Sequence, residues 1–276
     1  MSGVACDAAK RACVLRPRAR LRREQRPALS ATRPERQLGR VVLLASYLAA
    51  LLAVDTQVSL HGQLALGALT WIVLLVAARP LPVERRAQVA VVICAATVAE
   101  VTGSILWGVY TYRLHNLPLF VPPGHGLVYL AGISLSETAL VRARPRGFVL
   151  VVAACAATWG VVGLTVLPRF DLGGAIGVSV FLFFLWKGRV PMVYGGVFFV
   201  VPFLELWGTA VGLWQWHAIT PGLGLPMGNP PSGAMSGYVL FDIVAIALTA
   251  RLLRARAAVR RVRAPATLAT EPASSR

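Results

Sequence analysis

Four carboxylic acids stand inside long apolar stretches of this sequence, namely Glu100, Glu137, Glu205 and Asp242. A charged side chain in hydrocarbon costs about 3 kcal/mol on insertion scales, so such residues face a protein interior and by default indicate function. We expect no Lys or Arg at their depth, and burial without a basic partner favours the protonated form of a carboxyl group. A protonated carboxyl group can act as a general acid, which makes these four residues catalytic candidates. The alternative is that they only hydrogen-bond between helices.

Two of these acids open matching runs of residues, within 99–131 and 204–238. In each run a glutamate is followed by a glycine three residues later, then by a second glycine and two aromatic residues. The matched sets are Glu100, Gly103, Gly108, Tyr110 and Tyr112 against Glu205, Gly208, Gly212, Trp214 and Trp216. The first copy needs one extra residue to align. A Pro-Pro step follows in both copies, "VPPGHG" against "NPPSG", and the next acid comes 37 residues after the glutamate.

Acids beside aromatic faces in a dry cavity suit the protonation of an isoprenoid double bond. A second carboxylate and the π faces can then stabilise the carbocation. We expect Glu205 to be the proton donor, Asp242 to orient the water, and the loop 227–236 to act as a lid. The candidate substrate-binding residues are Trp107, Tyr110, Tyr112, His125, Trp214, Trp216 and Asn229.

More general structural roles are also open for the same residues. Tyr and Trp at helix ends commonly form an interfacial belt in membrane proteins. Gly208 and Gly212 form a GxxxG step, which is typical of close helix packing. The histidines, expected on loops at the outer side, have no metal-ligand spacing, and the cysteines have neither metal nor disulfide spacing, so we expect no metal site. Nucleotide, haem and phosphate motifs are also missing, and we expect no cofactor.

The composition places these residues in a multi-pass membrane protein. Of 276 residues, 57% are hydrophobic and 14% are charged, and the mean hydropathy is +0.66. Several apolar runs are long enough to cross a hydrocarbon layer of about 30 Å. We expect eight membrane-spanning helices, at roughly 41–58, 64–79, 87–109, 126–141, 147–167, 172–186, 190–216 and 236–253.

The basic residues support this count. Alternate loops should face the cytoplasm and collect Lys and Arg, and of 28 such residues only Arg113 and Arg169 fall on the other side. We therefore expect the protein to lie in the cell membrane with both termini in the cytoplasm. Residues 1–40 and 255–276 are expected to be basic, disordered arms that contact anionic lipid headgroups. The net charge of +17 does not indicate nucleic acid binding, because it lies in tails and short loops.

The repeat predicts how the eight helices are arranged. We expect an all-α fold with one membrane domain, 41–254, built from two related four-helix halves at about 41–142 and 147–254. Parallel repeats related by an axis along the membrane normal are known in transporters, with the functional site between the halves. Glu100 and Glu205 should then face each other across that axis.

The run Glu-x-x-Gly, followed by Gly-x-Tyr-x-Tyr, resembles the integral-membrane carotenoid-biosynthesis proteins of the carotenoid 1,2-hydratase type. The resemblance rests on Glu100, Gly103, Tyr110 and Tyr112, and on their counterparts by internal symmetry. It implies a cofactor-independent enzyme that adds water across the terminal double bond of a linear carotenoid, with the bilayer and an apolar isoprenoid as its partners. The alternatives are a small-molecule or lipid transporter, which also suits the repeat and the buried acids, and a non-catalytic membrane scaffold.

Overall fold

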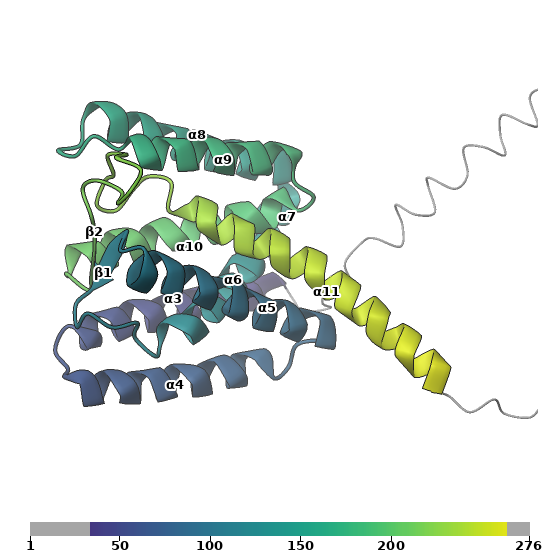
Figure 1. The fold of residues 1–276 in the computed structure, drawn as a ribbon. Helices are drawn as coiled ribbons and strands as arrows, with labels where there is room; N and C mark the ends of the chain where they lie inside the picture. Colours follow the sequence, from purple (N-terminus) through teal and green to yellow (C-terminus); the bar gives the residue numbers. More distant parts are fainter. Residues whose placement is uncertain (1–33, 264–276) are drawn as a thin grey trace, which may run out of the picture. The chain divides into compact units, whose positions relative to one another are not determined.

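The computed structural model describes residues 34–263, and most of the two expected basic arms lies outside them. The described chain is mostly helical and has almost no sheet, as the sequence predicts (Figure 1). Its α-helices are α3 (Pro34–Asp55), α4 (Leu60–Ala78), α5 (Val83–Glu100), α6 (Val121–Ser136), α7 (Ala139–Ala143), α8 (Pro145–Thr165), α9 (Leu172–Lys187), α10 (Pro191–Ala210) and α11 (Met235–Arg263). A π-helical turn, η1 (Val101–Leu106), and two short strands, β1 (Tyr110–Tyr112) and β2 (Trp214–Trp216), complete the described elements.

The structure is that of a multi-pass membrane protein, because six stretches of helix in the described residues are long and apolar enough to cross a bilayer. They are Arg36–Asp55, Leu60–Ala78, Val83–Leu106, Pro145–Thr165, Pro191–Ala210 and Met235–Arg256. The remaining long helices, α6 and α9, have 16 residues each, or about 24 Å of helix, less than the roughly 30 Å hydrocarbon core. The count of eight spanning helices therefore stays a prediction.

Helix α6 lies at the centre of the bundle. It packs against α3, α4, α5 and α10, and 13 of its 16 residues are buried. A helix that is apolar on all sides belongs in an interior, and neighbouring helices rather than lipid cover this one. Helix α11 packs along α5 and α9, so α5, α6, α10 and α11 enclose the middle of the molecule.

Several helix boundaries differ from those expected. Helix α6 begins at Val121 rather than near residue 126, because the Pro122-Pro123 step forms its first turn instead of a loop. Proline suits that position, since the first N–H groups of a helix have no partner within the helix. At the other terminus α6 ends at Ser136, so Glu137 lies at the helix end and not within a span. Helix α3 begins at Pro34, inside the arm expected to be disordered.

Both aromatic pairs lie in strands, whereas the sequence placed Trp214 and Trp216 within the segment 190–216. In the second copy helix α10 ends at Ala210, and in the first copy the π-helical turn η1 ends at Leu106, so both helices stop before the aromatic residues. Gly108 and Gly212 follow with φ of 71° and 75°, a left-handed conformation that glycine adopts without steric cost. These glycines redirect the chain, so β1 and β2 pair as an antiparallel ribbon at one end of the bundle (Figure 1).

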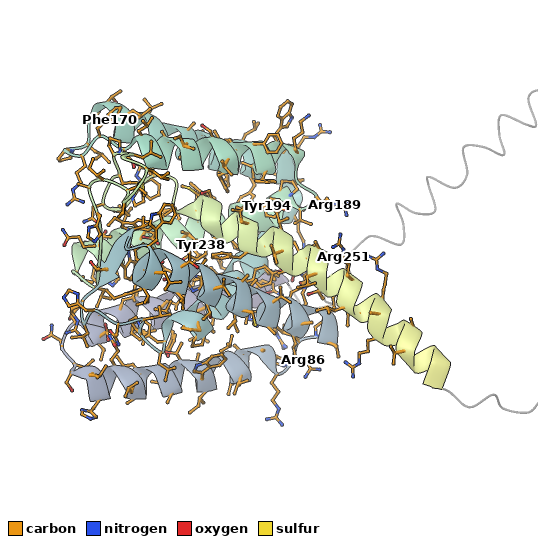
Figure 2. All side chains as sticks on the ribbon, viewed as in Figure 1. Arg86, Phe170, Arg189, Tyr194, Tyr238 and Arg251 are labelled. Carbon is orange, nitrogen blue, oxygen red and sulfur yellow. The ribbon has the colours of Figure 1, made fainter. Side chains whose placement is uncertain are left out.

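Basic side chains gather at the opposite end of the helices. Figure 2 shows Arg86, Arg189 and Arg251 far from the strands, whereas Phe170 lies at the strand end. Arg113 follows β1 directly, and Arg169 donates to the backbone oxygen of Trp216 at 2.8 Å. In the described part of the chain, Arg86, Arg189 and Arg251 thus lie at the end opposite the strands, and Arg113 and Arg169 lie beside the strands.

Candidate functional site

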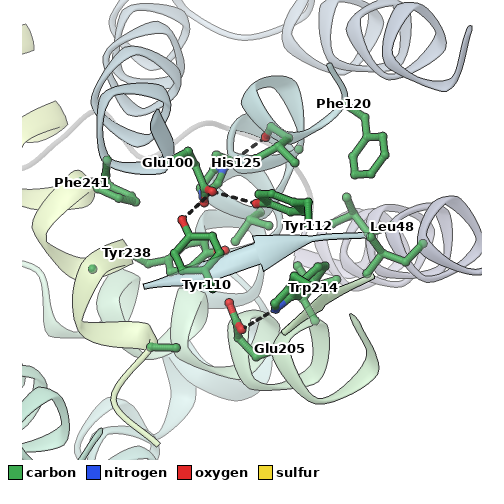
Figure 3. A pocket seen from close by; sticks show the side chains of 18 of the residues that line it. Leu48, Glu100, Tyr110, Tyr112, Phe120, His125, Glu205, Trp214, Tyr238 and Phe241 are labelled. Carbon is green, nitrogen blue, oxygen red and sulfur yellow. Dashed lines mark hydrogen bonds and ion pairs between the residues drawn. The ribbon is translucent and has the colours of Figure 1, made fainter. Parts of the chain in front are cut away.

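A cavity of about 240 Å³ lies next to the strand ribbon, among α3, α5, α6, α10 and α11 (Figure 3). Its lining combines leucines and aromatic rings with a few polar groups. The polar or partly polar side chains are Glu100, Tyr110, Tyr112, His125, Glu205, Trp214, Trp216 and Tyr238. Concave, mostly apolar sites with a few converging polar groups are the usual form of a small-molecule site.

Glu100 lies at the end of α5, where the two tyrosines of β1 reach back to it. Its Oε2 accepts hydrogen bonds from the hydroxyls of Tyr110 at 2.6 Å and Tyr112 at 2.7 Å. Its Oε1 lies 3.4 Å from Nε2 of His125. Burial, followed by the neighbouring carboxylate of Glu100, raises the pKa of both tyrosine hydroxyls above their ordinary value. Both phenols therefore remain protonated and act as donors.

Glu205, on α10, has a parallel arrangement with different donors. Its Oε2 accepts hydrogen bonds from the indole N–H of Trp214 at 3.1 Å and of Trp216 at 3.2 Å. In Figure 3 its other oxygen points away from Trp214, toward the ring of Tyr110. No side chain among residues 34–263 forms a salt bridge with this carboxyl group. Only 7% of Glu205 is exposed, so the group is enclosed with two neutral donors.

The two matched runs therefore pair with each other. In the ribbon Tyr110 lies opposite Trp216, Thr111 opposite Gln215 and Tyr112 opposite Trp214. A twofold axis between Thr111 and Gln215 produces this register. Tyr110 then faces Trp216, which is the repeat counterpart of Tyr112, and Tyr112 faces Trp214, which is the counterpart of Tyr110.

Backbone hydrogen bonds on either side of the β1–β2 pair follow the same twofold relation. Arg113 N donates to Leu213 O at 2.8 Å and His217 N donates to Val109 O at 3.0 Å. The extra residue of the first copy is taken up by the π-helical turn, since a π-helix bonds i to i+5 instead of i+4.

The glycines that follow each glutamate make room for an aromatic ring. A methyl group on Gly103 would lie 3.1 Å from a ring carbon of Tyr110, and one on Gly208 would overlap the indole of Trp214. Gly212 lies beyond the end of α10. The interpretation of Gly208 and Gly212 as a helix-packing GxxxG step is therefore wrong: the close neighbour is a side chain that folds back from the strand.

His125 completes the Glu100 side of the cavity. The sequence placed it in a loop, but it lies on α6, because that helix starts at Val121. Its Nδ1 lies 3.0 Å from the backbone oxygen of Val121. The imidazole also stacks on Tyr238, with ring centroids 5.0 Å apart. Tyr238 was not among the candidates, although its place one helical turn before Asp242 on α11 could have pointed to it.

The other two acids lie away from the cavity, so the expectation of one site with four acids is wrong. Glu137 forms an ion pair with Arg85 at 3.3 Å, because α5 begins at Val83 and carries that arginine alongside the end of α6. The expectation that no basic residue lies at its depth is therefore also wrong. Asp242 is 2% exposed and does not line the cavity. Its Oδ2 has no hydrogen-bond partner in the described part of the chain.

Trp107 and Asn229 also lie outside the cavity lining. The indole of Trp107 donates to the backbone oxygen of Pro221 at 2.8 Å. The side-chain oxygen of Asn229 accepts from the backbone N–H of Trp216 at 3.0 Å, so Asn229 holds β2 in place. Their contacts support the loops around the ribbon and do not contribute a group to the cavity.

The loop 227–236, expected to be a lid, is anchored by a buried acid that the sequence analysis missed. Oδ1 of Asp171 accepts from the backbone N–H of Gly174 at 3.0 Å and of Gly228 at 2.7 Å. Oδ2 accepts from Ser232 N at 2.6 Å. Two backbone bonds from the loop, at Gly228 and Ser232, therefore tie it to a fully buried carboxylate that also caps α9, which corrects that expectation. An Asp directly before the apolar run 172–186 is a helix N-cap signal, and it could have been recognised.

Residues 34–263 contain no group of three or more His, Cys, Asp or Glu side chains that could hold a metal ion. Comparison of the chain with family models, curated proteins and solved structures finds no match.

Proposed function

We propose that this protein is an integral membrane enzyme of isoprenoid biosynthesis that adds water to a terminal C=C bond of a linear carotenoid. One observation carries the proposal. Glu205 presents a carboxyl oxygen to a cavity lined mostly by aromatic rings and aliphatic side chains, with Glu100 and His125 as further acid–base groups. A carboxylic acid facing π surfaces in a mostly apolar site is suited to protonate an alkene and to stabilise the cation that forms.

The apolar side of the cavity supports an isoprenoid substrate. Leu48, Leu51 and Leu52 of α3 and Phe120 are among its lining residues. Its volume of about 240 Å³ equals that of roughly eight water molecules at about 30 Å³ each. Such a space holds only the branched end of a long polyene, and the rest of the chain would extend beyond the cavity.

In the proposed reaction Glu205 both gives and recovers one proton. Its O–H bond breaks as a C–H bond forms at the less substituted alkene carbon, which leaves a tertiary cation at the other carbon. The rings of Trp214, Trp216 and Tyr110 face this position and attract positive charge. The oxygen of one water molecule then forms the C–O bond, and a water proton returns to Glu205. The product is a tertiary alcohol, and no cofactor takes part.

The proposal includes an architecture of eight crossings in two four-helix halves, α3–α6 and α8–α11. It is supported by the twofold register of the ribbon and by matching helix contacts, since α6 packs against α10 and α11 packs against α5. We place the chain in the cell membrane with both termini in the cytoplasm, because the basic loops share one end of the bundle. The basic arms would then contact anionic lipid headgroups.

The test is expression in a host that accumulates linear carotenoids, followed by analysis of the extracted pigments. We expect hydroxylated carotenoid from the unaltered protein. Glu205→Gln keeps the size and hydrogen bonding but removes the acidic proton, so the rate should fall by about 10²–10⁴-fold. Asp242→Asn is the matched control, because it also replaces a buried acid but lies outside the cavity, and it should retain activity. Full activity of Glu205→Gln would refute the proposed function.

A transporter is the second candidate, because polar contacts lead inward from the basic end of the bundle. Arg85 contacts Glu137 and also donates to Gln88 at 3.2 Å, and Gln88 accepts from Tyr129 at 3.2 Å. Within residues 34–263 this series of polar contacts ends at Tyr129, which does not line the cavity. Unchanged pigments together with solute or lipid movement across reconstituted vesicles would favour this candidate.

A further inference from the structure

Glu100 and Glu205 occupy matching places but face different donors. The phenol contacts of Glu100, at 2.6 and 2.7 Å, are shorter than the indole contacts of Glu205, at 3.1 and 3.2 Å. Contacts from O–H donors are ordinarily shorter than contacts from N–H donors, so this difference follows the donor type. The charged neighbours distinguish the two acids instead: an imidazole lies beside Glu100, whereas Glu205 has two indole donors and no salt-bridge partner among residues 34–263.

The imidazole of His125 supplies the opposite charge. The backbone oxygen of Val121 can only accept, so Nδ1 of His125, 3.0 Å away, carries a hydrogen. Nε2 lies 3.4 Å from Oε1 of Glu100. Without a proton between them, two lone pairs would face each other. Two phenol donors stabilise the ionised form of Glu100. The proton is therefore assigned to Nε2, which makes His125 an imidazolium stacked on Tyr238.

We propose that Glu100 and His125 form a buried ion pair that holds the reacting water, while Glu205 is the protonated carboxyl group of the cavity. The water-holding role rests on the proposed hydration, but the ion pair itself does not. In the second copy the Pro230-Pro231 step aligns Gly233 with His125, so only the first copy can carry the imidazolium. The resting cavity is then neutral as a whole, which burial favours.

This assignment divides the reaction between the two acids. Glu205 exchanges protons with the substrate and the water, as described above. Glu100 accepts a hydrogen bond from the water at Oε1 and orients the water's oxygen toward the cationic carbon, where the C–O bond forms. It takes no proton, so the atoms and charges of the hydration balance as before. His125 is a positioning residue, because it acts by keeping Glu100 ionised.

Infrared spectroscopy of the protein in lipid, without substrate, tests where the protons lie. A protonated carboxyl group gives a carbonyl band that a carboxylate lacks. Glu205→Gln should remove one such band, and Glu100→Gln should remove none. His125→Gln removes the cation, so Glu100 should take up a proton and one band should appear. That new band should be lost again in the double variant of His125→Gln and Glu100→Gln. Asp242→Asn identifies the band of Asp242, a buried acid outside the cavity that forms no salt bridge among residues 34–263.

Nitrogen NMR gives a second measurement that leaves the cavity unaltered. His61, His115 and His217 are exposed, so replacing all three by Gln leaves His125 as the single histidine of a chain carrying a histidine-free tag. We expect the ¹⁵N signals of an imidazolium at neutral pH. A neutral imidazole, or loss of a carbonyl band in Glu100→Gln, would overturn the ion pair.

These outcomes are separate from those of the pigment assay. Hydration that depends on Glu205, combined with a neutral His125, would refute the ion pair and leave the proposed function standing. The expected spectra combined with no hydration of any linear carotenoid would support the ion pair and refute the function.

Discussion

At the scale of single residues, the site depends on what each aromatic group offers a carboxylate. Tyr110 and Tyr112 provide hydroxyl donors to Glu100, and Trp214 and Trp216 provide indole donors to Glu205. The spacing of acid, glycine and aromatic pair predicted that these residues act together. The choice of partners could not be predicted, because it depends on the helices ending before the aromatic residues and on the chain turning back.

The two tyrosines should make stability depend on alkaline pH. Burial raises their pKa above the ordinary value of 10.0. The unfolded chain therefore releases these protons at a lower pH than the folded one, and stability is fully present below about pH 10 and falls as the pH rises further. Replacing both by Phe should reduce this dependence. Thermal unfolding of the double variant and of the unaltered protein in detergent, from pH 8 to 11, measures it. An identical pH slope in the double variant would contradict the assignment.

At the scale of elements, the π-helical turn reconciles two copies of unequal length. Between its two glycines the first copy has one residue more than the second, and η1 absorbs it. The sequence predicted the extra residue but gave no indication of where it is accommodated. Helix existence was predictable from long apolar runs, whereas the ends of α6 and α10 were not. Helix α6 starts early because Pro122 and Pro123 form its first turn, and the chain turns away after α10 at Gly212, which has a positive φ.

Deleting Ile105 should therefore be tolerated. Its side chain is 52% exposed, and its removal gives the first copy the glycine spacing of the second, so η1 can become an ordinary helical turn. We expect a melting temperature close to that of the unaltered protein.

Deleting Ala210 is the matched control, because it makes the spacing from Gly208 to Gly212 shorter than in either copy. That variant should misplace Trp214 and lose most of its cooperative transition. Equal stability of the two deletion variants would contradict this role of the π-helical turn.

At the scale of the whole molecule, two ends with different chemistry organise the bundle. The strand end holds the cavity and the anchored loop, and the other end holds the basic loops. Hydropathy and basic-residue counting predicted this division, because both are sums over many residues. The burial of α6 and the role of Asp171 were not predictable in that way, since each depends on contacts between segments far apart in the chain.

Reporter fusions in the basic loops test the orientation. Fusions after residues 83, 144, 188 and 254 should all report the cytoplasm, whereas a fusion at the strand end, after residue 115, should report the other side. The physical reason is that clustered Lys and Arg resist translocation. A cytoplasmic signal at residue 115 as well, or an external one at any of the four, would refute both the eight-crossing scheme and the placement of the termini.

The register of the ribbon also bears on how such a molecule could arise. The strand pairing is self-complementary, because a twofold axis relates β1 to β2. Two identical copies of such a strand would therefore form the same backbone hydrogen bonds. Self-complementary contact is what defines the interface of a twofold homodimer. In a homodimer, however, both acids would have the same neighbours. Two copies of different sequence can give one glutamate two phenols and an imidazole and the other two indoles, and a single chain carrying both copies always pairs them. Divergence of the copies is therefore the condition under which the proposed acid and ion pair can share one cavity.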